Sequence, residues 1–328
     1  MKKLMKIFGI ILVVVVVVLV GASIYMKNAF PKVSPPPSLK VEITPERVER
    51  GKYLANHVTV CIDCHATRDW SKFSGPVIPG TEGKGGERFD ESMGFPGEFY
   101  SKNITPYGVS TWTDGELFRA ITTGVNRNGE PFFPVMPYPG YSHLDPEDIY
   151  SIIAYIRTLA PIKNDVPESA ANFPMNFILR TIPKDANFTK MPDKSNLEAY
   201  GKYLVTASAC IDCHTQFEKG GFVEGMEFAG GREFQFPTGE VLRSANITPD
   251  NESGIGKWTK DEFLNKFKSY DKPEMRNVPV KAGEFNTIMP WTMYGGMTVE
   301  DLSAIYAYLR TVKPINNKVE KFSKAGIR

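Results

Sequence analysis

The sequence predicts a mainly helical protein built from two tandem copies of one domain behind an N-terminal transmembrane helix. Three observations support this prediction. Short motifs recur in the same order in both halves, apolar residues near the end of each half have helical spacing, and a long apolar run follows the N-terminus. A length of 328 residues suits two domains of ordinary size. An apolar content of 42% and a charged content of 23% exclude a disordered chain.

An almost unbroken apolar run extends from Ile7 to Met26, directly after three lysines. At 1.5 Å per residue, its roughly 20 residues match the roughly 30 Å hydrocarbon core of a bilayer. The run is longer than the roughly 7–15 apolar residues of a signal peptide, so residues 1–27 are expected to be a retained anchor. A cleaved signal peptide, with small residues near Val20-x-Ala22, is the alternative. In both cases the lysines stay inside and the rest of the chain is exported.

The formal net charge of +2 comes from the anchor. Residues 1–27 contain four of the 39 basic residues and no acid, which leaves 35 basic and 37 acidic side chains in the exported part. Such a balance provides no basic surface for a polyanion. We therefore expect no nucleic-acid partner.

Prolines mark the segments that connect the expected units. Residues 28–44 are rich in proline, which favours extended polyproline II geometry and predicts a semi-rigid tether. Residues 161–196 contain five prolines and form the expected interdomain linker. The two domains are expected at residues 45–160 and 197–316, and residues 317–328 form a polar tail.

Six motifs occur in both halves of the chain and keep their order. The offsets between matching motifs lie between 143 and 153 residues. Six matches in register indicate a tandem duplication. The pairs are Gly51–Leu54 with Gly201–Leu204, Cys61–His65 with Cys210–His214, Asn103–Pro106 with Asn246–Pro249, Trp112–Thr113 with Trp258–Thr259, Met136–Pro137 with Met289–Pro290, and Tyr155–Thr158 with Tyr308–Thr311.

Each half is expected to end in an amphipathic helix. Asp145 can cap the first of these helices, with Pro146 at its first position. Thr298 and Asp301 approximate a capping box for the second. Apolar residues then follow at helical spacing and define one face of each helix. The preceding Gly- and Pro-rich stretches lack periodicity and are expected to be ordered loops. The apolar positions are Ile149, Ile152, Ile153 and Ile156 in the first helix and Leu302, Ile305 and Leu309 in the second.

Each half also contains one Cys-x-x-Cys-His motif, the signature of covalent c-type haem attachment. A thioredoxin-like redox pair would need a βαβ context, which is missing, and a zinc site would need more ligands than His57 and His143 supply. Disulfides within the motifs would close only very short loops. We therefore expect two haem c groups. Their thioether bonds would come from Cys61, Cys64, Cys210 and Cys213, and their proximal iron ligands would be His65 and His214.

A methionine at the same place in both halves is the expected distal iron ligand. Met136 lies 71 residues after His65, and Met289 lies 75 residues after His214. Each precedes a proline, which stiffens the loop that presents the sulfur. Methionine–histidine ligation raises the potential of a haem and suits electron transfer. Four other methionines correspond less well between the halves: Met93, Met226, Met293 and Met297. His143 would allow bis-histidine ligation, but the second half has no counterpart, and we expect His143 to face solvent.

The repeated Asn-Ile-Thr-Pro and Trp-Thr motifs have two interpretations. In the first, Asn or Trp donates a hydrogen bond to a haem propionate. In the second, the motifs form turns with a purely structural role. The sequence favours neither interpretation over the other.

Together these features resemble class I cytochrome c domains, in which one helix precedes Cys-x-x-Cys-His, a loop supplies methionine and another helix ends the domain. Over roughly residues 45–315 the chain more specifically resembles cytochrome subunits of membrane-bound alcohol and gluconate dehydrogenases. Those subunits usually carry three haem motifs and attach through C-terminal amphipathic segments, whereas this chain has two motifs and a polar tail. The segments that carry this resemblance are the Asn-Ile-Thr-Pro motif, Gly124–Gly129, Met136–Pro139, Ala154–Thr158 and Asn172–Arg180.

The expected function is that of a two-haem electron carrier rather than a catalytic enzyme. It would be anchored in the inner membrane by a single span, with its haem domains on the periplasmic side. Its donor would be a membrane dehydrogenase or a quinol-oxidising complex, and its acceptor another cytochrome or a terminal oxidase. A cytochrome subunit of a membrane-bound dehydrogenase complex is one alternative. A two-haem peroxidase is disfavoured because it needs an open iron position, whereas both halves supply a methionine.

Overall fold

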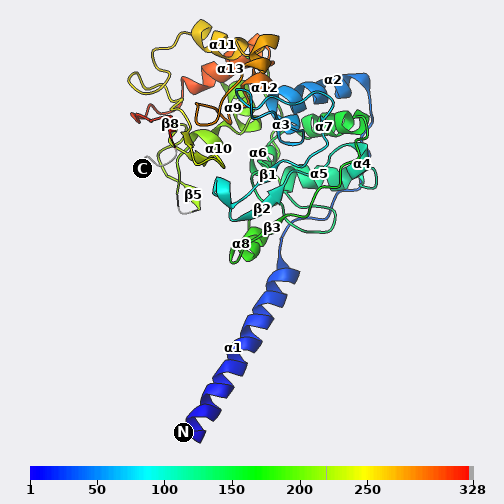
Figure 1. Ribbon diagram of the computed structural model, residues 1–328. Coiled ribbons are helices and arrows are strands. Elements are labelled where there is room, and N and C mark those ends of the chain that lie inside the picture. Colours follow the sequence, from blue (N-terminus) through cyan, green and yellow to red (C-terminus); the bar gives the residue numbers. More distant parts are fainter. Residues whose placement is uncertain (219, 325–328) are drawn as a thin grey trace.

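A long N-terminal helix, α1, projects from a body in which two similar helical units lie side by side (Figure 1). The computed structural model describes residues 1–218 and 220–324, so the last four residues of the expected polar tail lie outside the described residues. The helix α1 (Lys2–Ala29) buries none of its residues in the protein. It has the length and apolar composition to cross a membrane, with a mean hydropathy of 3.2 over 18 residues.

The two units contain matching helices in the same order, as the repeated motifs predict. In each, a helix leads into a short turn with the cysteines. Four further helices follow in the first unit, and three helices with one 3₁₀ turn follow in the second. The first unit has α2 (Pro45–Tyr53) with a π-helical turn η1 (Leu54–Val58), α3 (Cys61–Cys64), α4 (Pro106–Val109), α5 (Asp114–Thr123), α6 (Tyr138–Tyr141) and α7 (Pro146–Thr158). The second has α9 (Leu197–Ala207), α10 (Cys210–His214), α11 (Lys260–Lys268), the 3₁₀ turn η3 (Pro273–Asn277), α12 (Trp291–Tyr294) and α13 (Val299–Leu309).

Short antiparallel strands and one small helix complete the body. The strands form sheets in the orders β1-β2-β3, β4-β5 and β6-β7-β8. The linker between the units contributes β3 and the helix α8 (Met175–Thr181). The strands are β1 (Arg88–Phe89), β2 (Gly97–Tyr100), β3 (Ala170–Ala171), β4 (Phe217–Glu218), β5 (Gly221–Phe222), β6 (Glu233–Gln235), β7 (Val241–Arg243) and β8 (Phe322–Ser323), and the 3₁₀ turn η2 (Glu91–Met93) lies between β1 and β2.

The first and last helices of each unit pack at close range through a glycine. A Cβ atom on Gly51 of α2 would overlap the carbonyl oxygen of Ser151 in α7. In the second unit, a Cβ atom on Gly201 of α9 would overlap the carbonyl oxygen of Ala304 in α13 in the same way. The glycine of the repeated Gly-Lys-Tyr-Leu motif is therefore required by a close approach of two backbones.

The caps of the terminal helices agree with the sequence prediction, with one difference. The Asp145 side chain accepts from the Glu147 N–H at the start of α7, and Thr298 accepts from the Asp301 N–H at the start of α13. The Asp301 carboxylate accepts from tyrosine hydroxyls instead of closing the expected capping box. Complete capping boxes form at Thr113 and Thr259, which begin α5 and α11. The repeated Trp-Thr motif therefore supplies a helix cap.

The two units meet through a reciprocal pair of hydrogen bonds. The Tyr53 hydroxyl of the first unit donates to Asp301 of the second over 2.6 Å and accepts from the Thr298 N–H. Its repeat counterpart, Tyr203, donates to Asp148 of the first unit over 2.6 Å and accepts from the Asp145 N–H. Since Asp148 and Asp301 are also counterparts, the interface has approximate twofold symmetry.

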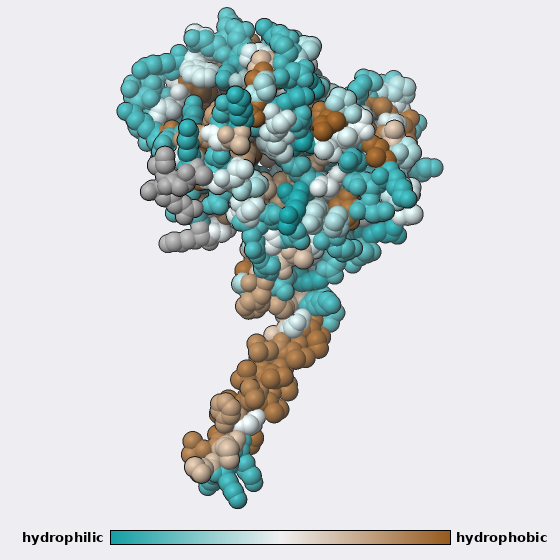
Figure 2. All heavy atoms as spheres, in the orientation of Figure 1, coloured by the Kyte–Doolittle hydropathy of each residue, from teal (hydrophilic) through white to brown (hydrophobic). Residues whose placement is uncertain are grey.

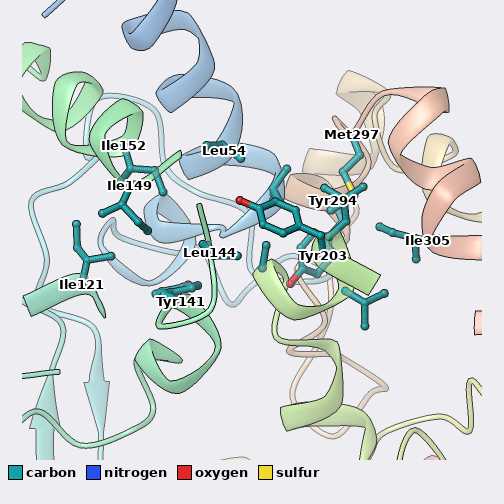
Figure 3. Packing of buried hydrophobic residues seen from close by; sticks show 14 of the residues in the cluster. Leu54, Ile121, Tyr141, Leu144, Ile149, Ile152, Tyr203, Tyr294, Met297 and Ile305 are labelled. Carbon is teal, nitrogen blue, oxygen red and sulfur yellow. The ribbon is translucent and has the colours of Figure 1, made fainter. Parts of the chain in front are cut away.

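One buried apolar cluster continues from the first unit into the second. Leu144, Ile149 and Ile152 come from the first unit, and Tyr203, Met297 and Ile305 from the second (Figure 3). A continuous core and the reciprocal hydrogen bonds hold the units as one body.

The Pro-rich segment after α1 differs from a free-standing spacer. The Ser34 N–H donates to Asp185 of the linker over 2.7 Å, and the Val41 N–H donates to Asp114 of α5 over 2.9 Å. Val41 is buried in the core cluster. The segment lies along the first unit because these backbone groups find partners there.

Candidate functional site

Both Cys-x-x-Cys-His motifs begin after a residue in the left-handed backbone region. Val60 has φ +44° and Ala209 has φ +50°, a conformation that is unfavourable for a β-branched valine above all. The carbonyls of these residues accept from the Asp63 and Asp212 N–H groups, both over 3.0 Å. The same strained turn in both units holds the two cysteines on one short helical turn, which is the arrangement that two thioether bonds to one ring require.

The expected proximal histidines have identical hydrogen bonds. The Nδ1 atom of His65 lies 2.6 Å from the carbonyl oxygen of Lys102, and that of His214 lies 2.7 Å from the carbonyl oxygen of Ala245. Because a carbonyl only accepts, Nδ1 carries the proton and Nε2 keeps its lone pair for a metal. Burial lowers the pKa of both rings from the ordinary value, which further favours the neutral, ligating form.

A glycine in each unit, which the sequence analysis did not identify, packs against the backbone that accepts from the histidine. Gly85 donates its N–H to the His65 carbonyl and Gly230 to the His214 carbonyl. Both glycines have positive φ, and a Cβ on Gly85 would lie 2.5 Å from the Lys102 carbonyl oxygen. A Cβ on Gly230 would lie 2.5 Å from the carbonyl carbon of Ala245. The signal was present as a repeated Gly-Gly, 20 residues after His65 and 16 residues after His214.

A tyrosine ties each methionine loop to the cysteine turn of the same unit. Tyr141, five residues after Met136, donates to the Thr59 carbonyl over 2.8 Å. Tyr294, five residues after Met289, donates to the Ser208 carbonyl over 2.7 Å. Burial raises the pKa of both phenols well above the ordinary value, so they remain donors. The methionine loops are thereby anchored next to the motifs that they are expected to complete.

The two methionine loops differ in their contacts with the other unit. Met136 and Met289 are both half-buried and pack against the core cluster. The Met289 carbonyl also accepts from Ser74 of the first unit over 2.6 Å. The competitors Met293 and Met297 are buried in the core, and His143 is exposed with Nδ1 3.1 Å from the Asn187 carbonyl oxygen. The ligand role of Met136 and Met289 remains a prediction.

A continuous cavity of about 3440 Å³ connects the two cysteine turns. Cys61, Cys64, His65 and Met136 line it from the first unit, and Cys213 lines it from the second. Cys210, His214 and Met289 are absent from the described lining of the cavity. Two thiols, an imidazole Nε2 and a thioether around an apolar cavity are the donor set of a covalently bound haem, so the residues fit haem c.

A buried charge cluster adjoins the first cysteine turn. Arg68 forms ion pairs with Asp63 over 2.9 Å and with Glu87 over 2.7 Å. Burial raises the pKa of Asp63 to about 6, although the charge of Arg68 acts in the opposite direction. The Arg68 guanidinium also lies over the Trp70 ring, 4.3 Å from its centre. The cluster neutralises the charges that the motif buries.

The repeated asparagine is structural, which corrects the propionate hypothesis for this residue. Asn103 accepts from the N–H and hydroxyl of Thr105 and donates its amide hydrogens to the carbonyls of Ile162 and Asn164. Asn246 makes the corresponding bonds to Thr248 and Ile315. An amide with both hydrogens in use has none for a propionate. Trp112 lines the cavity, and its propionate role remains a prediction.

The fold and these sites define a helical protein of the covalent-haem class. Residues 198–313 match the family model described as Cytochrome c. These residues therefore form a domain of the cytochrome c family, which binds haem c.

Three curated proteins are similar to this chain at 26–27% identity. The cytochrome c subunit of alcohol dehydrogenase (quinone) from Gluconacetobacter polyoxogenes is 27% identical over 82% of this chain and 56% of its own length. The gluconate 2-dehydrogenase cytochrome c subunit from Pantoea cypripedii is 26% identical over 81% of this chain and 59% of its own length. A protein described as diheme cytochrome c-type, from Cereibacter sphaeroides, is 27% identical over 78% and 82%. The chain thus spans a little over half the length of the two dehydrogenase subunits to which it is similar.

Proposed function

We propose that the chain is a dihaem c-type cytochrome that relays single electrons, with one class I cytochrome c domain at residues 45–160 and another at residues 197–316. Residues 1–27 would anchor it in the inner membrane with both haem domains on the periplasmic side. The observation that carries the proposal is the duplicated site. Each unit repeats the strained turn, the histidine bonded to a carbonyl, the Gly-Gly pair and the tyrosine-anchored methionine.

When bound, haem c would supply one-electron chemistry at iron, and the protein would set its potential. Cys61 and Cys64 would hold one group and Cys210 and Cys213 the other. His65 and His214 would present Nε2 as the proximal ligand in a fixed orientation, because Nδ1 is bonded to a carbonyl. Met136 and Met289 would supply a thioether sulfur as the further iron ligand.

The arrangement of the units supports relay between the two sites. Cysteines of both motifs line one cavity, and the core is continuous between the units. The donor would be a membrane dehydrogenase or a quinol-oxidising complex, and the acceptor another cytochrome or a terminal oxidase. The relative described as a diheme cytochrome, which the chain covers over 82% of its length, supports a stand-alone carrier.

Replacing the methionines tests the ligand set. Met136→Ala and Met289→Ala should each abolish one low-spin haem signal. Each should also lower the potential of that site alone, because a thioether ligand raises the potential of a haem. Met93→Ala and Met226→Ala are the matched controls and should retain both signals. A wild-type spectrum in both Met136→Ala and Met289→Ala would refute the assignment.

A cytochrome subunit of a membrane dehydrogenase complex is the second candidate. The relatives described as subunits of alcohol and gluconate dehydrogenases favour it. Purification from membranes in a gentle detergent distinguishes the two candidates. A dehydrogenase that comigrates in stoichiometric amount supports the subunit, and a cytochrome that migrates alone supports the carrier. One high-spin haem together with hydrogen peroxide turnover would instead indicate a peroxidase.

A further inference from the structure

We propose that the linker helix α8 and the residue pair before it form a second membrane contact, which lies in the outer surface of the bilayer beside α1. The inference rests on the proposed anchoring by α1 and concerns a surface of the linker, outside the repeated motifs. The contact consists of Phe173, Pro174, Met175, Phe177 and Ile178 and is called the α8 patch below.

Large apolar side chains of the α8 patch face solvent. Phe173 is 82% exposed and Ile178 is 46% exposed, while Met175 and Phe177 are half-buried. After residue 29, Phe173 is the most exposed large apolar residue in the described chain. Exposed apolar residues that gather in one place mark a surface for a partner or a membrane. Figure 2 shows apolar residues just below the body, next to the upper end of the apolar helix.

Hydrogen bonds hold this patch at the end of α1. Arg180 of α8 donates over 3.0 Å to the carbonyl of Phe30, and Phe30 is the residue that caps the C-terminal end of α1. Asp185, just after α8, accepts from the N–H and hydroxyl of Ser34 over 2.7 and 3.0 Å. Arg180 also pairs with Glu130 of the first unit. The segment that leaves α1 is thus attached to the α8 region and cannot carry the body far away from it.

The position of α1 in a bilayer then determines the depth of the α8 patch. The apolar run ends at Met26, and Lys27 is the first charged residue after it. A lysine at this place lies at the headgroup level, because its charge stays in water. The helices α1 and α8 are in direct contact. The patch therefore lies beside the last turn of α1, at the boundary between headgroups and acyl chains. Aromatic and aliphatic side chains are stable at this depth.

The occupant of the patch is the lipid bilayer itself rather than a protein. Phe30 and the α8 patch are contiguous with a helix that would be surrounded by lipid, and α1 buries none of its residues against the protein. Contact at two places would fix the orientation of the body, so that the same faces of the two units always point toward the membrane (Figure 1).

Site-directed spin labelling of the full holoprotein in nanodiscs tests the proposal. If all four native cysteines are used in thioether bonds, Phe173→Cys introduces the one free thiol, and Ile178→Cys is a second reporter. Val299→Cys is the matched control, because Val299 is 50% exposed and begins α13. Figure 1 shows α13 on the far side of the body from α1. Val16→Cys, within α1, reports on the anchor.

The readout is the ratio of oxygen to nickel-chelate accessibility of the nitroxide. We expect this ratio to be several-fold higher at positions 173 and 178 than at position 299, and highest at position 16. Aqueous ratios at 173 and 178 with a membrane ratio at 16 would overturn the α8 contact and leave the anchor intact. Aqueous ratios at all four positions would overturn the anchor as well. Two haem signals in the optical spectrum report on the carrier function independently of both results.

Discussion

The hydroxyl of Ser74 in the first unit donates to the carbonyl of Met289 in the second over 2.6 Å. The same hydroxyl accepts from the Trp291 N–H over 3.1 Å, so it bridges the backbone on both sides of Pro290 in the methionine loop. Ser74 itself is buried with φ +66°, an unfavourable conformation that Asn286 stabilises by accepting the Ser74 N–H. Within residues 1–218 and 220–324, the Met136 loop has no such hydrogen bond from the second unit. The first unit therefore supports the ligand loop of the second.

Ser74→Ala should lower the potential of the second haem and leave the first unchanged. The variant loses two hydrogen bonds, one from the Ser74 hydroxyl to the Met289 carbonyl and one from the Trp291 N–H to that hydroxyl, each worth about 1 kcal/mol. Together they correspond to about 90 mV or less for one electron if the loop loosens in one redox state only. A potentiometric titration measures both potentials. Ser71→Ala is the control, because Ser71 is exposed and its hydroxyl contacts only the nearby Asp69. Equal shifts at both haems in Ser74→Ala would contradict a local effect.

Gly85→Ala should weaken both haem retention and folding. Its Cβ would lie 2.5 Å from the Lys102 carbonyl, the acceptor of His65 Nδ1, and its φ is +68°. Gly80→Ala is the control, since Gly80 has φ +82° and open space around the position of a Cβ. We expect about 1–2 kcal/mol of backbone strain in the control and several kcal/mol in Gly85→Ala, measured by denaturant unfolding of the holoprotein. Equal losses of unfolding free energy in Gly85→Ala and Gly80→Ala would show that the Lys102 carbonyl can move to make room for the Cβ atom.

The sequence predicted what depends on local chemistry. Asp145 before Pro146 defined the start of a helix, and the duplicated Cys-x-x-Cys-His motifs lie on equivalent turns. Contacts between the units could not be predicted, because Ser74 and Met289 are far apart in sequence and neither has a distinctive motif for the pairing. The propionate role of the repeated asparagine was wrong for a related reason. An amide that binds distant linker carbonyls has the same local sequence as one that binds a ligand.

Tyr53→Phe should destabilise the interface between the units more than Tyr203→Phe. Asp148 keeps two hydrogen bonds from Arg50, each of 2.9 Å, when Tyr203 loses its hydroxyl. Asp301 keeps only Tyr200 as a side-chain donor in the described part of the chain. A lost hydrogen bond to a buried charged group costs about 1–3 kcal/mol, and we expect Tyr53→Phe near the upper end of this range.

Thermal or denaturant unfolding of the holoprotein measures the difference between these variants. Tyr107→Phe is the matched control, because its hydroxyl also donates to an aspartate, Asp165, but is exposed. Such an exposed contact should contribute little to stability. A cost for Tyr107→Phe that equals that for Tyr53→Phe would show that the interface contact has no special weight.

His57 should make the association of the two units sensitive to acid. Its Nδ1 lies 2.9 Å from the Met293 carbonyl oxygen of the second unit, and burial lowers its pKa from the ordinary value. The unfolded chain then binds the proton more readily, so stability is fully present above the ordinary pKa and falls as the pH drops below it. The unfolding midpoint, measured between about pH 8 and about pH 5, should fall less in His57→Gln than in the wild type. His143→Gln, at an exposed position, should behave as the wild type, and an unchanged acid-side loss in His57→Gln would assign the sensitivity to other groups.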